Sequence, residues 1–166
     1  MLHVDINAGN IVFSISPRYI SKEESFDLVL VNSDVKLSAK GLTLNEEIEL
    51  FDYDFVSLRN KLELLVSNKE DVVSWNTEEE TIFFSITKKE QCFIWNLRYI
   101  IGGKEDDFLN FNFVLSETDM NSIISELYSI IDSCIQEILT NKDANIEELL
   151  KKAASDFQNN SLDYAE

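Results

Sequence analysis

The fold class is decided by residues 81–139, which read TIFFSITKKEQCFIWNLRYIIGGKEDDFLNFNFVLSETDMNSIISELYSIIDSCIQEIL. Three apolar runs of strand length occur in this stretch, Thr81–Thr87, Gln91–Ile101 and Asp107–Leu115. Alternation of large apolar residues with period two is typical of β-strands. The middle run is apolar on both faces, which favours a central position in a sheet. Polar or glycine-rich turns separate the runs, so the stretch predicts an antiparallel meander.

A long amphipathic helix is predicted directly after the third run. Ser116-Glu117-Thr118-Asp119 has the pattern of a capping box, and its acids suit the N-terminus of a helix dipole. Apolar residues then recur every three or four positions over about five turns. They are Met120, Ile123, Ile124, Leu127, Ile130, Ile131, Cys134 and Ile138. We expect a helix over 117–139 that packs across one face of the meander.

The first half of the chain shows the same order of elements. Residues 1–50 alternate in short runs typical of strands, one of which we expect to end at Pro17, because proline cannot donate to a sheet ladder. Asn32-Ser33-Asp34 has the chemistry of a hairpin turn. Asp54 is expected to cap a helix over 54–67, whose apolar stripe is Phe55, Leu58, Leu62 and Leu65.

The predicted fold class is therefore α+β, an antiparallel sheet of hairpins and meander with one helix after each β-rich half. Strands are expected over 72–115, a break over 140–143, a short C-terminal helix over 144–157 and a frayed tail over 158–166. A length of 166 residues favours a single domain over 1–166. The two helix starts resemble each other, Asp54-Phe55-x-x-Leu58 and Asp119-Met120-x-x-Ile123, which indicates either a degenerate repeat or two ordinary helix starts.

The chain is strongly acidic, with 31 acidic against 14 basic side chains and a formal net charge of −17. Such a charge repels nucleic acid and anionic membranes, and it favours a basic protein partner. Solubility alone is the alternative explanation. The N-terminus has neither signal-peptide character nor a membrane-length apolar run. Together with two well-separated cysteines, expected to be small buried hydrophobes, these features favour the cytoplasm.

No catalytic, metal or cofactor motif is recognisable. His3 is the single histidine, and neither Cys92 nor Cys134 has a basic neighbourhood that would activate a thiol. These three residues also lack the spacing of a zinc site. Acidic pairs are numerous, so a carboxylate-based hydrolase stays open by residue type alone. We expect no catalytic residue, no metal, no cofactor and no enzyme activity.

Two acidic runs are predicted to meet at one end of the meander. The start of the first strand and the connection between the second and third strands lie at the same sheet edge. The run Glu78, Glu79 and Glu80 then approaches the run Glu105, Asp106 and Asp107. Three interpretations remain: a docking surface for a basic protein, a Ca²⁺ site, or two solvated loops. If they form a docking surface for a basic protein, these six residues are the candidate partner-binding site.

The order of these patterns resembles the WapI-like immunity proteins of bacterial polymorphic toxin systems. The residues that carry the resemblance are Asp54-Phe55-x-x-Leu58-x-x-x-Leu62, Trp95, Leu109-x-Phe111-x-Phe113 and Ser116-x-Thr118-Asp119-Met120, within residues 26–132. The resemblance implies a small cytoplasmic protein that binds and neutralises a cognate toxin domain, often a nuclease. It carries no functional residue over to this chain. An acidic inhibitor of a basic toxin domain is the leading hypothesis, and a structural or adaptor domain whose acidity serves solubility is the alternative.

Overall fold

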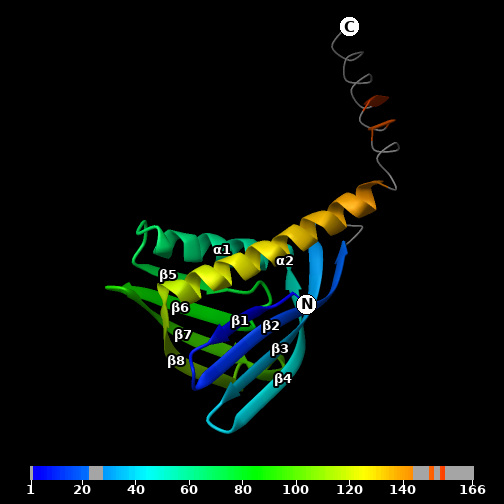
Figure 1. Ribbon diagram of the computed structural model, residues 1–166. Coiled ribbons are helices and arrows are strands. Elements are labelled where there is room, and N and C mark those ends of the chain that lie inside the picture. The colour runs from blue at the N-terminus through cyan, green and yellow to red at the C-terminus, as the bar shows by residue number, and fades with distance from the viewer. Residues whose placement is uncertain (1, 23–27, 144–149, 152–153, 156–166) are drawn as a thin grey trace, which may run out of the picture.

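A computed structural model describes residues 2–22, 28–143, 150–151 and 154–155 of the chain (Figure 1). Over these ranges it shows two antiparallel four-stranded sheets and two long helices, so the predicted α+β class is confirmed. The strands are β1 Val4–Asn7, β2 Ile11–Lys22, β3 Val29–Ala39, β4 Leu42–Phe51, β5 Val72–Asn76, β6 Ile82–Lys89, β7 Cys92–Ile100 and β8 Phe108–Ser116. The helices are α1 Asp52–Val66, α2 Glu117–Asp143 and a short 3-10 turn at Ile101–Gly103.

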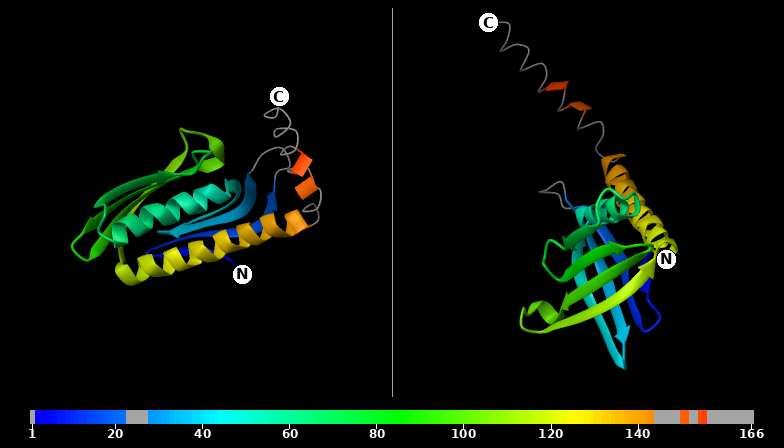
Figure 2. Two further views of the ribbon diagram at one scale, coloured as in Figure 1. Left: turned by 90° about the horizontal axis from the view of Figure 1, so that it is seen from above. Right: turned by 90° about the vertical axis from the view of Figure 1, so that its left-hand side faces the viewer.

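Each half of the chain consists of four strands followed by a helix. The strand orders are β1-β2-β3-β4 and β5-β6-β7-β8, so each sheet is a plain meander in which sequence neighbours pair. The strands of the two sheets cross, and α1 and α2 lie antiparallel and side by side (Figures 1 and 2). Helix α1 contacts the edge strand β5 of the second sheet, and α2 contacts β1 and β2 of the first sheet. The predicted meander and the central position of the Gln91–Ile101 run are confirmed.

The core is formed where the two sheets and the two helices meet. Phe84 of β6 lies at its centre, with its ring centroid 5.2 Å from that of Trp75 and 4.9 Å from that of Trp95. Phe13 of β2 belongs to the other sheet and lies 6.0 Å from Phe84 in an edge-to-face arrangement. Aromatic pairs at these separations add to the apolar area that they bury. One aromatic group therefore joins the inner faces of both sheets.

Helix α2 buries six of the eight residues of the predicted apolar stripe, and Ile124 and Ile138 are partly buried. Its buried residues are Met120, Ile123, Leu127, Ile130, Ile131 and Cys134. The expectation that the helix packs across one face of the β5–β8 meander is wrong, because it contacts β1 and β2 of the other sheet more than β8. The helix begins at Glu117 as predicted but runs to Asp143, so the break expected over 140–143 is wrong. The Thr140 hydroxyl donates to the carbonyl oxygen of Gln136 (2.8 Å), which lets this polar residue stay within a helix.

Parts of the predicted C-terminal region lie outside the described residues. This applies to the tail over 158–166 and to most of the short helix over 144–157. Within the described ranges, no helix combines the length and apolar character needed to cross a membrane.

Two expectations for the first sheet are wrong. Strand β2 continues through Pro17, because β1 pairs only as far as Ile15 and the register with β3 shifts between Pro17 and Tyr19. An unpaired edge and a bulge are the places where a sheet tolerates proline. Asn32-Ser33-Asp34 lies inside β3, and the hairpin turns instead at Lys40-Gly41, where both residues have positive φ as a two-residue turn requires.

We predict that the contact between the sheets dominates stability. Phe84→Ala should lower the free energy of unfolding by about 3–5 kcal/mol, because it leaves a cavity among Phe13, Trp75 and Trp95. The neighbouring Phe83 faces the other side of the sheet and is only half-buried, so Phe83→Ala is the matched control with a smaller loss. Urea unfolding followed by circular dichroism measures both, and equal losses would contradict the central role of Phe84.

Candidate functional site

The two acidic runs lie at the same end of the second sheet. Glu78–Glu80 form the turn between β5 and β6, and Glu105–Asp107 lie in the connection between β7 and β8. The meander order places both connections at one sheet end. All six side chains are exposed. Among the described residues, none of the six carboxylates forms an ion pair with a Lys or Arg side chain.

Half of the predicted residues share a cavity of about 280 Å³. Glu79, Glu80 and Glu105 line it together with Thr81, Phe83, Arg98, Ile100 and Gly103. Glu78, Asp106 and Asp107 are not among its lining residues. The structure therefore gathers three carboxylates, from two turns that are distant in sequence, around one concave surface. We call this the acidic edge cavity.

Sequence reasoning missed Arg98, the one basic residue of this cavity. Its guanidinium carbon lies 4.5 Å from the ring centroid of Phe108 and 5.8 Å from that of Phe83. Such cation–π contacts hold the side chain against the sheet. Its positive charge also reduces the repulsion among the surrounding carboxylates. The signal was the alternation of β7, which places Arg98 on the outer face opposite Leu97 and Tyr99.

One wall of the cavity is tied to helix α1 through the buried residue Asp54. Its Oδ2 accepts a hydrogen bond from the Phe51 amide (2.8 Å), and its Oδ1 accepts one from the Glu78 amide (2.9 Å). Helix α1 begins at Asp52, so the expectation that Asp54 is the N-cap of a helix over 54–67 is wrong. From the third helical position its carboxylate reaches back to the N-cap amide. Burial raises the pKa of Asp54, although the two amide donors act in the opposite direction.

Tyr53 lies beside the same turn, and the negative charges of the turn affect the pKa of its hydroxyl. Burial raises the pKa of Tyr53 to about 12, and Glu78, Asp54 and Glu79 contribute further because negative charges disfavour the phenolate. Glu78 also forms a side-chain hydrogen bond with Tyr53. Glu78 is thus directed towards α1, whereas Glu79 and Glu80 line the cavity.

The opposite wall is tied to the first sheet through Glu46 of β4. The Tyr99 hydroxyl donates to Glu46 Oε2 (2.6 Å), and the Gly102 amide donates to Glu46 Oε1 (3.0 Å). Burial raises the pKa of Tyr99, and the Glu46 carboxylate raises it further. This single carboxylate connects the two sheets. It also positions the 3-10 turn, whose last residue, Gly103, lines the cavity.

The two cysteines occupy different environments. Cys134 is buried on α2, and burial raises the pKa of its thiol to about 12, with a smaller contribution from Asp52. A thiol with such a pKa stays protonated and is a poor nucleophile. Cys92 is exposed, so the expectation that both cysteines are buried is wrong for Cys92, which opens β7 on its outer face.

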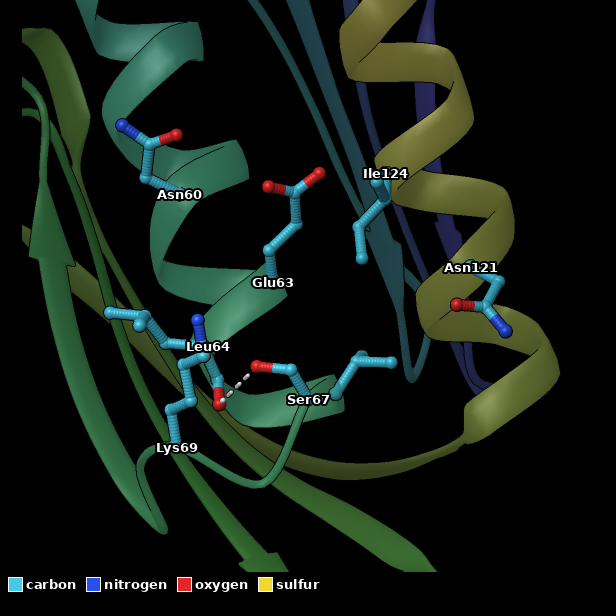
Figure 3. A pocket seen from close by; sticks show the side chains of 8 residues that line it. Asn60, Glu63, Leu64, Ser67, Lys69, Asn121 and Ile124 are labelled. Atoms are coloured by element: carbon cyan, nitrogen blue, oxygen red, sulfur yellow. Dashed lines mark hydrogen bonds between the residues drawn. The ribbon is translucent and has the colours of Figure 1, made fainter.

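A larger groove of about 610 Å³ lies between α1 and α2 (Figure 3). Its lining residues are Asn60, Glu63, Leu64, Val66, Ser67, Lys69, Asn121 and Ile124. Glu63 accepts a hydrogen bond from Tyr128, and the Ser67 hydroxyl donates to the Leu64 carbonyl oxygen (3.4 Å). Glu63 and Ser67 thus bond to neighbours in the two helices, and the polar side chains drawn in Figure 3 do not converge on a common point. We therefore keep the acidic edge cavity as the candidate site.

Comparison with known proteins gives little further guidance. No protein-family model matches the chain, and no curated protein matches it. A solved structure, described as that of the plant transcriptional regulator PBF-2, is similar over 88% of this chain and 92% of that chain. The sequence identity is 10% and the TM-score is 0.43. A likeness at this level supports no conclusion about function.

We predict that Asp54 stabilises the acidic edge more than its counterpart Asp119 stabilises the start of α2. Asp119 Oδ2 also accepts from the amide three residues earlier, that of Ser116 (2.9 Å), but it is exposed. Asp54→Ala should lower the free energy of unfolding by about 1–3 kcal/mol for each part-buried amide that is left without an acceptor. In Asp119→Ala the Ser116 amide can bond to water instead, so the free energy of unfolding should fall by only about 1 kcal/mol. Urea unfolding compares the two, and equal losses would contradict a special role for Asp54.

A second prediction concerns the connection between the sheets. Tyr99→Phe, Glu46→Ala and the double variant form a double-mutant cycle, because neither single variant can form the hydrogen bond between these two side chains. A hydrogen bond to a charged acceptor contributes about 1.5–3 kcal/mol, so the cycle should give a coupling energy of that order. The measurement is the free energy of unfolding of all four proteins. A coupling energy near zero would show that Tyr99 and Glu46 do not stabilise each other.

Proposed function

We propose that this protein is a binding module that uses the acidic edge cavity to engage a basic protein. The observation that carries the proposal is the gathering of Glu79, Glu80 and Glu105 around one concave surface. A basic side chain of a partner would meet several carboxylates there at once. The net charge of −17 adds long-range attraction to the same kind of partner.

The geometry supports binding better than catalysis. The cavity carboxylates belong to exposed turns, whereas a carboxylate-based hydrolase needs an acid whose pKa burial has raised next to an ionised carboxylate. Among the described residues, the carboxyl groups with raised pKa are Asp54, which bonds to two backbone amides, and Glu126, which lies on α2 outside the cavity. Hydrogen bonds to α1 and β4 hold the walls of the cavity, which suits recognition because less conformational freedom is lost when a partner binds.

The finer proposal is an inhibitor that neutralises a toxin domain, as the resemblance to WapI-like immunity proteins implies. A nuclease domain has a basic channel for its substrate, and an acidic protein could occupy or flank that channel. In this proposal the partner is basic and the protein acts in the cytoplasm. Electrostatic complementarity of this kind mainly raises the association rate and selects the partner.

The test begins by identifying a partner and then measures how fast it binds. The chain is immobilised, and a soluble extract of the source cells is passed over it at low and at high salt. A retained basic protein is purified and assayed for an activity that this chain suppresses. Stopped-flow kinetics then follow its association with the Glu79→Lys, Glu80→Lys, Glu105→Lys triple variant. We expect association at low salt to slow by about tenfold or more, with a weaker salt dependence.

A matched control separates the cavity from net charge. Glu70, Asp71 and Glu90 are exposed at the opposite end of the same sheet, and their substitution by lysine changes the net charge equally. This control should associate almost as fast as the unaltered protein. Equal slowing in both variants would contradict the role of the cavity. Absence of a partner at either salt concentration would favour the alternative, a structural or adaptor domain whose acidity serves solubility.

A further inference from the structure

A second cluster of potential ligands lies away from the acidic edge cavity, where β1 begins beside α2 (Figure 2). His3 Nε2 lies 3.2 Å from Asp5 Oδ2 and 3.7 Å from Glu126 Oε1. One ligand atom from each residue lies within 4.8 Å of the others. The chain contains no other histidine. Its neighbours in this cluster are both carboxylates, which are ligands for a divalent cation.

We propose that His3, Asp5 and Glu126 form a Zn²⁺ site that joins β1 to α2. Zn²⁺ binds imidazole nitrogen and carboxylate oxygen at about 2.0–2.2 Å in tetrahedral sites, which places neighbouring ligand atoms about 3.3 Å apart. The two nitrogen–oxygen distances given above lie close to that separation. Three protein ligands leave the fourth position to water. A mixed nitrogen and oxygen set suits zinc better than Ca²⁺, which takes six to eight oxygen ligands.

The carboxylate of Glu126 is already oriented for this role. The Asp5 amide donates to Glu126 Oε2 (2.9 Å), which leaves Oε1 directed towards His3. Outer-shell hydrogen bonds of this kind hold metal ligands in place. Burial raises the pKa of the Glu126 carboxyl; the Asp5 amide and the charge of His3 act in the opposite direction, and the charge of Asp5 raises it slightly. A partly desolvated carboxylate gains more from a nearby cation than a fully solvated one does.

The competing explanation is an ion pair between a protonated His3 and the two carboxylates. A proton on Nε2 and a zinc ion would use the same atom and the same oxygens. Zinc binding needs the neutral imidazole, so the affinity of the proposed site should fall as the solution is acidified. The two explanations therefore differ in what Zn²⁺ does to the imidazole at neutral pH.

The first measurement uses the unaltered full chain. The single imidazole makes the proton NMR signals of His3 unambiguous, and we expect Zn²⁺ to shift or broaden them at about one ion per chain. Calorimetry with Zn²⁺ gives the stoichiometry and the affinity. Mg²⁺ in excess should not compete, because it prefers an all-oxygen octahedral site. Unchanged His3 signals in saturating Zn²⁺ would overturn the proposal.

Variants then assign the ligands. Loss of an outer-shell partner lowers metal affinity by about 10–100-fold, and His3→Gln or Glu126→Gln should lower the zinc affinity at least as much. Exposed Cys92 is another potential zinc ligand, so Cys92→Ser is the matched control and should bind zinc unchanged. Zinc should also raise the melting temperature of the unaltered protein and of Cys92→Ser, but not that of His3→Gln. Loss of binding in Cys92→Ser, or full binding in His3→Gln, would overturn the assignment.

Discussion

The contact of Phe84 with Phe13 joins the two sheets at the centre of the core. Each four-stranded meander has an inner face that α1 and α2 cover only in part, so the two sheets must bury these faces against each other. Trp95 shows how strongly packing dominates there. Its indole Nε1 is buried and, among the described residues, has no hydrogen-bond partner. Such a donor costs about 1–3 kcal/mol, which the surrounding aromatic contacts must outweigh.

Apolar packing forms the interior of the molecule, and a few carboxylates set the positions of whole segments by accepting hydrogen bonds from backbone amides. Asp54 holds the start of the β5–β6 turn, and Glu46 holds the 3-10 turn after β7. Both carboxylates accept hydrogen bonds from backbone amides, and in this way they hold in place the two turns that carry the exposed acids. The walls of the acidic edge cavity are thus supported from two elements outside the β5–β8 sheet, α1 and β4.

The turns show where local sequence patterns succeed and where they mislead. The β5–β8 meander could be predicted because its strands have strong apolar alternation and are separated by charged or glycine-rich turns. Asn32-Ser33-Asp34 has turn chemistry, but Ser33 is buried and its hydroxyl bonds to the Val31 carbonyl oxygen (3.1 Å), so the strand continues. Pro17 is tolerated because its neighbour strand has already ended. In both cases pairing with a distant strand outweighed the local preference.

The α+β class and the helix after each β-rich half could be predicted from the sequence, as could the shared sheet end of the two acidic runs. These features follow from periodicity and from the order of a meander, which are local properties of the chain. Three contacts became known only from the folded chain: Arg98 joins Glu79, Glu80 and Glu105, Glu46 bonds to Tyr99, and Glu126 approaches His3. Such pairs join residues far apart in sequence; Glu126 accepts from Asp5, 121 positions away. Alternation within a strand predicts which face a residue occupies, but it does not predict these contacts, because they arise only when packing of the apolar faces brings sheets and helices together.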